Sequence, residues 1–229
     1  MHAPFDRIRT ELTDIMSAKP SEVSSEKLLG PTKKESVFAS ILDTIITKLR
    51  AELDTAPTPT SWATLEHLPY LSAVIDEENH LSFGLTARTA RIADEQLTYT
   101  PSSHVTSTTN KGTFYKIPTG TPISITTLSA HTAETVFPDP FVFDPERWLG
   151  DEGRERRKYQ MAFGKGGRVC IGIELARAEL YFFTAALVTR FDMKLFETDD
   201  SDVAFLYDYQ VAMPKLDSKG VQVMAKALA

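Results

Sequence analysis

The most regular pattern of apolar residues lies between residues 33 and 54. Apolar side chains recur there every three to four positions, the spacing that puts them on one face of an α-helix. The positions are Phe38, Ile41, Leu42, Ile45, Ile46, Leu49 and Leu53. Thr32 and Glu35 form a capping-box pattern before this stripe, and the segment 56–60, APTPT, interrupts it afterwards. The pattern predicts one long amphipathic helix over about 33–54.

A second helix is predicted over about 70–81. Pro69 suits its first position and Gly84 ends it, while Ser61 caps a short turn before it. Its buried face comprises Leu71, Val74, Ile75 and Leu81. Nearer the N-terminus, apolar residues from Phe5 to Met16 predict another helix, which stops at Pro20, and residues 20–32 read as a polar linker.

Beyond Gly84 the pattern changes from helical to extended. Short runs rich in Thr, Ile and Tyr between 85 and 128 predict strands, with turns at 110–112 and 118–120. The proline-rich segment 137–150 predicts an ordered, non-regular meander, and the charged segment 150–160 predicts a surface loop. The segment 171–190 predicts a last long helix that is buried on most sides, and strands and turns follow over 191–229. The apolar residues of that helix are Leu175, Ala176, Leu180, Phe183 and Leu187.

These elements predict a mainly α protein with small β-sheets (α+β). We expect residues 1–229 to form a single domain, divided into five consecutive segments. The segments are 1–32 (helix plus linker), 33–84 (helical), 85–130 (β-rich), 131–170 (meander and cysteine loop) and 171–229 (long helix and C-terminal β/turn region).

Composition and charge exclude several classes of function. The chain has 229 residues and a formal net charge of −6, which does not favour bulk binding of nucleic acid. Its single cysteine excludes an intrachain disulfide. No apolar run approaches the length of a membrane span, and the first residues lack the apolar core of a signal peptide. We therefore expect a soluble, intracellular protein.

Candidate chemistry is concentrated in residues 163–172, FGKGGRVCIG, which contain that single cysteine, Cys170. The glycines allow the backbone to turn and to lie close to a flat ligand. Arg168 can neutralise an anionic group of such a ligand. A helix is predicted directly after Cys170, and a helix N-terminus favours thiolate over thiol. A lone cysteine is otherwise a small buried hydrophobe, but this flanking pattern favours a loop that presents a thiolate.

This segment resembles the haem-thiolate signature of the cytochrome P450 monooxygenases. The resemblance extends over nearly the whole chain from about residue 34 and corresponds to less than half of a family member. It implies a truncated cytochrome P450 fold, the C-terminal half, with haem b as cofactor and Cys170 as the axial thiolate ligand of the iron. It also implies that Arg168 holds a haem propionate, that Phe163 packs beside the sulfur, and that Gly172 belongs to the haem-binding loop.

The segment LPYLSAVIDEENHLSFG resembles the family helix that carries Glu-x-x-Arg. Glu77 matches the glutamate, whereas His80 stands where the family has arginine. The resemblance places the third member of this structural network at Arg147, in FDPERW. We expect a bidentate ion pair between Glu77 and Arg147. We expect His80 to weaken the network, because an imidazole lacks the five donors of a guanidinium.

Three other features have a structural and a functional interpretation. Arg88 matches a family position that contacts a haem propionate, and this role is favoured over the alternative of an exposed strand arginine. His131 has no partner at metal-ligand spacing, so a surface or hydrogen-bonding role is favoured. The basic residues Arg154, Arg156, Arg157 and Lys158 read as a solvated loop, or alternatively as a docking surface for an acidic reductase.

The family's long central helix, which delivers protons to bound dioxygen, has no counterpart in the sequence. The segments that flank it in the family meet around Thr44–Ile46, and the apolar stripe stays in phase across this join. We therefore interpret the chain as the product of a deletion or of a mis-spliced gene model.

The resemblance implies oxidation of a lipophilic small molecule with dioxygen, of the kind found in secondary metabolism. Electrons would come from a nicotinamide-dependent reductase, and the family is associated with the endoplasmic reticulum membrane. We expect poor or no turnover by this chain. Two alternatives stay open: a non-catalytic haem-binding remnant, and a haem-free protein in which Cys170 is a redox-sensitive thiol. The sequence names no substrate and no oligomeric state.

Overall fold

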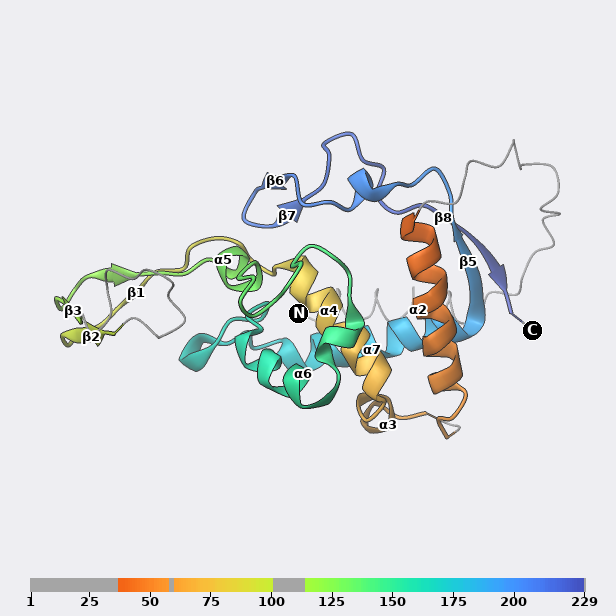
Figure 1. The fold of residues 1–229 in the computed structure, drawn as a ribbon, viewed down its shortest axis with the longest axis horizontal. Helices are drawn as coiled ribbons and strands as arrows, with labels where there is room; N and C mark the ends of the chain where they lie inside the picture. Colours follow the sequence, from red (N-terminus) through yellow and green to blue (C-terminus); the bar gives the residue numbers. More distant parts are fainter. Residues whose placement is uncertain (1–36, 58–59, 101–113, 229) are drawn as a thin grey trace, which may run out of the picture.

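The computed structural model describes residues 37–57, 60–100 and 114–228 (Figure 1). The helix predicted near the N-terminus, the linker at 20–32, the capping box at 32–35 and the turn at 110–112 lie outside the described residues.

Four helices form the main core. They are α2 (Val37–Leu53), α3 (Trp62–Glu66), α4 (Pro69–Ser82) and α7 (Ile173–Arg190). Their buried side chains form one apolar cluster, consisting of Ile45, Leu49, Leu53, Leu65, Leu71, Val74, Ile75, Tyr181 and Val188. From Ile45 onward, the predicted stripe on α2 packs against α4 and α7, and α2 runs unbroken through Thr44–Ile46. Burial of this cluster is the main driving force for the arrangement.

Helix α2 also caps two other helices. The Glu52 carboxylate accepts hydrogen bonds from the backbone N–H groups of Tyr70 and Leu71, both 2.8 Å, in the first turn of α4. Arg50 donates to the carbonyls of Val188 (3.0 Å) and Phe191 (2.8 Å) at the end of α7. Each charge complements the partial charge of the helix end that it meets. These bonds fix the start of α4 and the end of α7. Both helices adjoin the candidate site, because α7 begins directly after the cysteine loop and α4 carries Glu77 and His80.

The boundaries of α3 and α4 follow their local signals. Ser61 Oγ accepts a 3.2 Å hydrogen bond from Thr64 N, and α4 has Pro69 as its first residue. At its other end, Phe83 adopts a left-handed conformation with φ of 55°, and Gly84 follows with φ of 56°. A left-handed residue after the last turn is a common helix stop.

The strands are short and pair antiparallel. In the described residues every sheet has two strands. The pairs are β1 (Arg91–Ile92) with β4 (Pro122–Ile123), β2 (Leu97–Tyr99) with β3 (Tyr115–Ile117), β5 (Phe191–Leu195) with β8 (Val223–Ala227), and β6 (Tyr207–Asp208) with β7 (Ala212–Met213). Figure 1 shows the first two pairs extending away from the helices. The predicted combination of helices with small sheets is confirmed.

The prediction of a surface loop over 150–160 is wrong. Residues Gly150–Arg156 form helix α6, and a 3₁₀ turn over Arg157–Tyr159 continues it. Acidic residues occupy its first turn and arginines its last turn, which suits the helix dipole. Gly153 packs so closely on Trp148 that a Cβ would lie 2.0 Å from the Trp148 carbonyl. The charged residues of 150–160 suggest a loop, but the packing of Gly153 on Trp148 stabilises a helix there.

The prediction that the last helix is buried on most sides is also wrong. In α7 only Tyr181 and Val188 are fully buried, whereas Leu175 is 52% exposed and Phe182 46%. Phe183 and Leu187 are also exposed. The helices α2, α3 and α4 cover one side of α7, and no other described element covers the side that carries these residues. Among the residues that the structure describes, no helix has both the length and the apolar character of a membrane span.

Candidate haem-thiolate site

Two glycines and several backbone hydrogen bonds shape the loop around Cys170. Gly164 and Gly166 have φ of 71° and 74°, in the left-handed region that glycine adopts without strain. The N–H of Cys170 donates to the Phe163 carbonyl at 2.9 Å, which closes the loop. Helix α7 begins at Ile173, three residues after the cysteine, with Gly172 as its N-cap. The predicted position of Cys170 at a helix N-terminus is thus observed.

The surface around Cys170 is exposed and includes three apolar side chains. Cys170 is exposed, Ile171 is fully exposed, and Val169 and Leu175 are about half exposed. A Cβ at Gly172 would lie 3.8 Å from Cys170 Sγ, so no side chain crowds the sulfur on that side. An exposed thiol next to a helix N-terminus has the donor chemistry and the access that a haem iron requires. The residues present therefore fit the thiolate side of a haem.

The two arginines predicted to hold the propionates, Arg168 and Arg88, lie on the surface. Arg168 lies in the 3₁₀ turn Gly166–Arg168 of the cysteine loop and is exposed. Arg88 follows α4 and is also exposed. Neither guanidinium has a hydrogen bond or ion pair with any residue in the described part of the chain. Phe163 is half-buried: its carbonyl holds the Cys170 N–H, and its ring lines a cavity behind the loop.

Glu77 is the centre of a buried polar network between α4 and the meander. Its Oε1 accepts a 2.8 Å hydrogen bond from Asp144 N and lies 3.4 Å from Arg147 Nε. Its Oε2 accepts a 2.6 Å bond from the indole Nε1 of Trp148 and lies 3.4 Å from His80 Nδ1. The Glu77 side chain is fully buried. Several donors thus compensate the burial of this carboxylate.

The structure brings Glu77, His80 and Arg147 together, but the pair between Glu77 and Arg147 is not bidentate. Only Arg147 Nε faces the carboxylate. The guanidinium donates instead to backbone carbonyls of the meander, at Pro138 (2.7 Å), Asp139 (3.2 Å), Val142 (3.0 Å) and Asp144 (3.3 Å). Arg147 therefore mainly fixes the path of residues 138–144.

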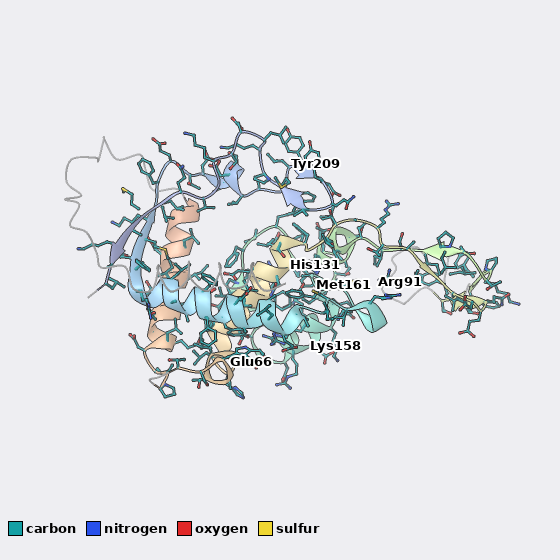
Figure 2. The ribbon with its side chains drawn as sticks, turned by 180° about the vertical axis from the view of Figure 1, so that it is seen from behind. Glu66, Arg91, His131, Lys158, Met161 and Tyr209 are labelled. Atoms are coloured by element: carbon teal, nitrogen blue, oxygen red, sulfur yellow. The ribbon has the colours of Figure 1, made fainter. Side chains whose placement is uncertain are left out.

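His80 forms a reciprocal pair with His131, the last residue of helix α5 (Thr127–His131). Each imidazole bonds the other residue's carbonyl: His80 Nε2 lies 2.8 Å from His131 O, and His131 Nδ1 lies 2.8 Å from His80 O. Both residues are fully buried, and Phe137 stacks on the His80 ring at 4.3 Å between centroids. The third contact of the pair is a 2.8 Å bond from Met161 N to His131 Nε2 (Figure 2).

These contacts determine the tautomer of His131. Nδ1 must carry the proton to donate to the His80 carbonyl, and Nε2 must be unprotonated to accept from Met161 N–H. Burial lowers the pKa of His131 to about 4, which favours the same neutral form. The hydrogen-bonding role expected for His131 is observed, in a buried rather than an exposed position.

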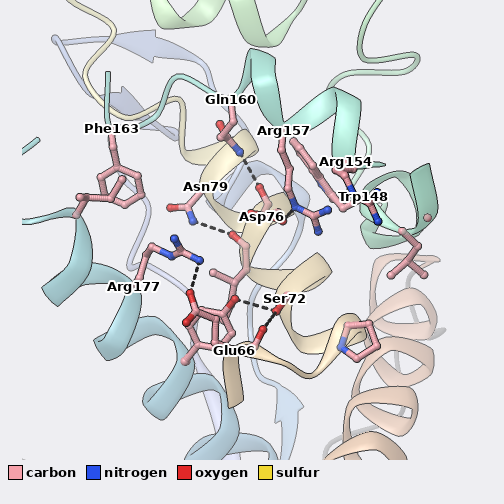
Figure 3. Close-up of a pocket in the computed structure, with 16 residues that line it drawn as sticks. Glu66, Ser72, Asp76, Asn79, Trp148, Arg154, Arg157, Gln160, Phe163 and Arg177 are labelled. Carbon is pink, nitrogen blue, oxygen red and sulfur yellow. Dashed lines mark hydrogen bonds and ion pairs between the residues drawn. The ribbon is translucent and has the colours of Figure 1, made fainter. Parts of the chain in front are cut away.

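A cavity of about 540 Å³ lies between α4, α6 and the first half of α7 (Figure 3). Ion pairs cross its wall, between Arg157 Nε and Asp76 Oδ2 (2.5 Å) and between Arg177 and Glu66 (2.7 Å). Burial raises the pKa of Asp76 above its usual range, despite the opposing effect of Arg157. Phe163 lies at the edge of this cavity, which therefore adjoins the base of the cysteine loop.

The basic cluster of residues 154–158 is not a solvated loop. Arg156 donates to the carbonyls of Val136 (2.8 Å) and Arg147, and Arg157 pairs with Asp76. Arg154 and Lys158 pair within their own segment, with Asp151 and Glu155. Two of the four cations thus fasten α6 to the rest of the fold.

Trp148 and the burial of His131 were not predicted from the sequence. No local pattern marks either one, since their partners Glu77 and Met161 lie 71 and 30 residues away along the chain. Within the described segments, no group of three or more His, Cys, Asp or Glu side chains is placed to hold a metal ion.

Comparison with known proteins is consistent with this geometry. The family model for cytochrome P450 matches residues 43–217. The cytochrome P450 monooxygenase sdnE of Sordaria araneosa is 41% identical over 192 residues, which cover 79% of this chain and 34% of that protein. The tryptophan 6-hydroxylase fscE of Fusarium equiseti is 36% identical over 184 residues, covering 80% of this chain and 34% of the relative.

Solved structures show the same fold. A retinoic acid-bound cyanobacterial CYP120A1 superimposes with a TM-score of 0.62 and 24% identity, covering 83% of this chain and 41% of the other. A zebrafish cytochrome P450 in complex with abiraterone gives a TM-score of 0.60. The chain spans about a third of the length of the curated relatives that it matches. The described residues are a partial cytochrome P450 fold, and the chain belongs to the cytochrome P450 family.

Proposed function

We propose that this chain supplies the thiolate side of a haem-binding monooxygenase, with Cys170 as the iron ligand. The observation that carries the proposal is the exposed Cys170, held by the Phe163 carbonyl three residues before α7. A thiolate is the ligand with which a haem protein promotes O–O cleavage.

Each residue of the loop has a distinct proposed role. Cys170 binds the iron, and Arg168 and Arg88 neutralise the propionates by charge-assisted hydrogen bonds. Phe163 limits the access of water to the sulfur, and Gly172 leaves space beside it. When bound, haem supplies the chemistry that activates dioxygen. Glu77, His80 and Arg147 act at a distance, by fixing the framework behind the loop.

For the whole protein we propose oxidation of a lipophilic small molecule with dioxygen, with electrons from a nicotinamide-dependent reductase. Membership of the monooxygenase family supports this reaction class. We also propose that this chain on its own turns over poorly or not at all, because none of the residues above delivers protons to dioxygen. Substrate hydroxylation by the purified chain with reductase would refute that second statement.

Reconstitution with haem tests the ligand assignment. Haem is added to the purified chain, which is then reduced and exposed to carbon monoxide, and the Soret band is recorded. We expect the red-shifted band of thiolate ligation, and its loss in Cys170→Ala. His67→Gln changes an exposed histidine outside the site and serves as the control that keeps the band. Failure to retain haem would instead favour the haem-free, redox-sensitive thiol, and retained haem without substrate oxidation would indicate a non-catalytic haem binder.

A further inference from the structure

The buried histidine pair lies directly behind the cysteine loop. Helix α4 ends near His80 and helix α5 ends at His131, and the two rings lie 5.2 Å apart between centroids. The carbonyls at a helix C-terminus lack partners within their own helix. Here each ring donates to the other residue's carbonyl, so the pair joins the two helix ends directly.

The free nitrogen of His131 extends this connection to the loop. His131 Nε2 accepts the Met161 N–H at 2.8 Å, and the Met161 carbonyl accepts Gly164 N–H at 2.8 Å. Phe163, inside that turn, accepts the Cys170 N–H at 2.9 Å. A continuous series of hydrogen bonds therefore runs from the end of α4 through His131 to the backbone of Cys170.

A close backbone contact holds the same segment from a second side. A Cβ at Gly84 would lie 2.2 Å from the Ala162 carbonyl oxygen, so the chain after α4 lies directly against the residue after Met161. The segment 161–162 is thus fixed by His131 on one side and by Gly84 on the other. Because packed segments of this kind transmit small displacements, a shift at Met161 moves the turn that presents the sulfur.

We propose that His131 is a positioning residue for the Cys170 ligand loop, acting through the Met161 N–H, and that His80 holds it in the accepting tautomer. This inference rests on the proposed role of Cys170. The ring touches neither the sulfur nor its ligand. Its role is to set where the turn 161–164 begins, and so to set the direction in which the loop presents Cys170.

Two amide substitutions separate the two nitrogens of His131. The Oε1 of Gln reaches the position of Nε2, so His131→Gln retains an acceptor for Met161 N–H. The shorter Asn reaches only the position of Nδ1, so His131→Asn retains the donor to His80 and loses the Met161 contact. The two variants are similar in polarity, which makes each a control for the other.

Hydrogen exchange in the purified, haem-free chain measures the effect. We expect exchange of the Met161 amide to be about tenfold faster in His131→Asn and within about threefold of the parent in His131→Gln. The Leu49 amide in α2 reports global opening and should stay unchanged in both. Equal exchange of Met161 in the two variants would overturn the proposal, and so would an acceleration at Leu49 that matches the one at Met161.

A spectroscopic readout connects the loop to its ligand. In the reduced, carbon monoxide-treated sample, we expect His131→Asn to have a smaller fraction of the thiolate-type Soret band than the parent. We expect His131→Gln to have the same fraction as the parent. A band in His131→Asn as large as in the parent would contradict the positioning role. If the parent chain lacks this band, the proposed function fails while the exchange result still decides whether His131 fixes Met161.

Discussion

The indole Nε1 of Trp148 donates a 2.6 Å hydrogen bond to Glu77 Oε2, in the interior between α4 and the meander. Both side chains are fully buried. A buried carboxylate that loses a donor retains the cost of its desolvation. This single bond therefore connects the meander to the buried carboxylate of Glu77 on α4.

Trp148→Phe should destabilise the protein by about 2–4 kcal/mol, because it removes the donor and leaves Glu77 Oε2 short of a partner. Urea unfolding followed by circular dichroism measures the change. Trp62→Phe is the matched control, because the buried Trp62 Nε1 has no acceptor within the described residues. We expect that variant to stay within about 1 kcal/mol of the parent. Equal losses in both variants would show that the bond to Glu77 adds nothing beyond packing.

Gly84→Ala should destabilise the protein by about 2–4 kcal/mol, because the new Cβ would collide with the Ala162 carbonyl at a φ of 56°. Gly120 has a φ of 77° but nothing within 4 Å of its Cβ position. Gly120→Ala should therefore cost only about 1 kcal/mol, which is the backbone contribution alone. Thermal unfolding of the two variants separates the collision from the backbone strain, and similar losses would argue against close contact with Ala162.

Stability should fall as the pH is lowered from about 6.5 to about 4, because burial lowers the pKa of His131 to about 4 in the folded chain. Between these values the unfolded chain binds a proton that the folded chain excludes, so acid favours unfolding. The expected loss is at most about 3 kcal/mol. Urea titrations at pH 7 and pH 4 measure it, and His131→Gln, which has no such proton, should lose less over the same range. An identical pH dependence in that variant would show that His131 is not the responsible group.

Glu78 should act in the opposite direction. Burial raises the pKa of this half-buried carboxyl to about 7, so the folded chain keeps a proton that the unfolded chain releases above about 4.5. Stability attributable to Glu78 is present at low pH and is lost as the pH rises from 4.5 to 7. We expect Glu78→Gln to be more stable than the parent by about 1–2 kcal/mol at pH 8 and unchanged at pH 4. The exposed Glu134→Gln is the control, and a similar gain there would refute the assignment.

The parts of the fold that the sequence predicts are those with local signals. The apolar stripe predicts α2, Ser61 predicts the start of α3, and Pro69 and Gly84 delimit α4. The fold class and the position of Cys170 before a helix were also predictable, since the loop pattern is continuous in sequence. In these segments, the residues that determine a helix end or a loop lie within a few positions of it in the sequence.

The remaining features depend on contacts between distant residues. Helix α6 was missed because its charged residues read as a loop, whereas the packing of Gly153 on Trp148 fixes it. The sequence predicts a bidentate pair between Arg147 and Glu77. In the structure, backbone carbonyls of the meander accept hydrogen bonds from most of the Arg147 N–H groups. The burial of α7 was overestimated because an apolar composition does not show which neighbouring elements cover a helix.

The exposed apolar side of α7 has a consequence for the life of the chain in the cell. Phe182, Phe183 and Leu187 present to solvent the kind of surface that chaperones and quality-control proteases recognise. Any partner or ligand that covers this side removes that recognition signal. The amount of protein that accumulates in a cell would then depend on occupancy of this exposed side of α7, in addition to the folding free energy of the chain.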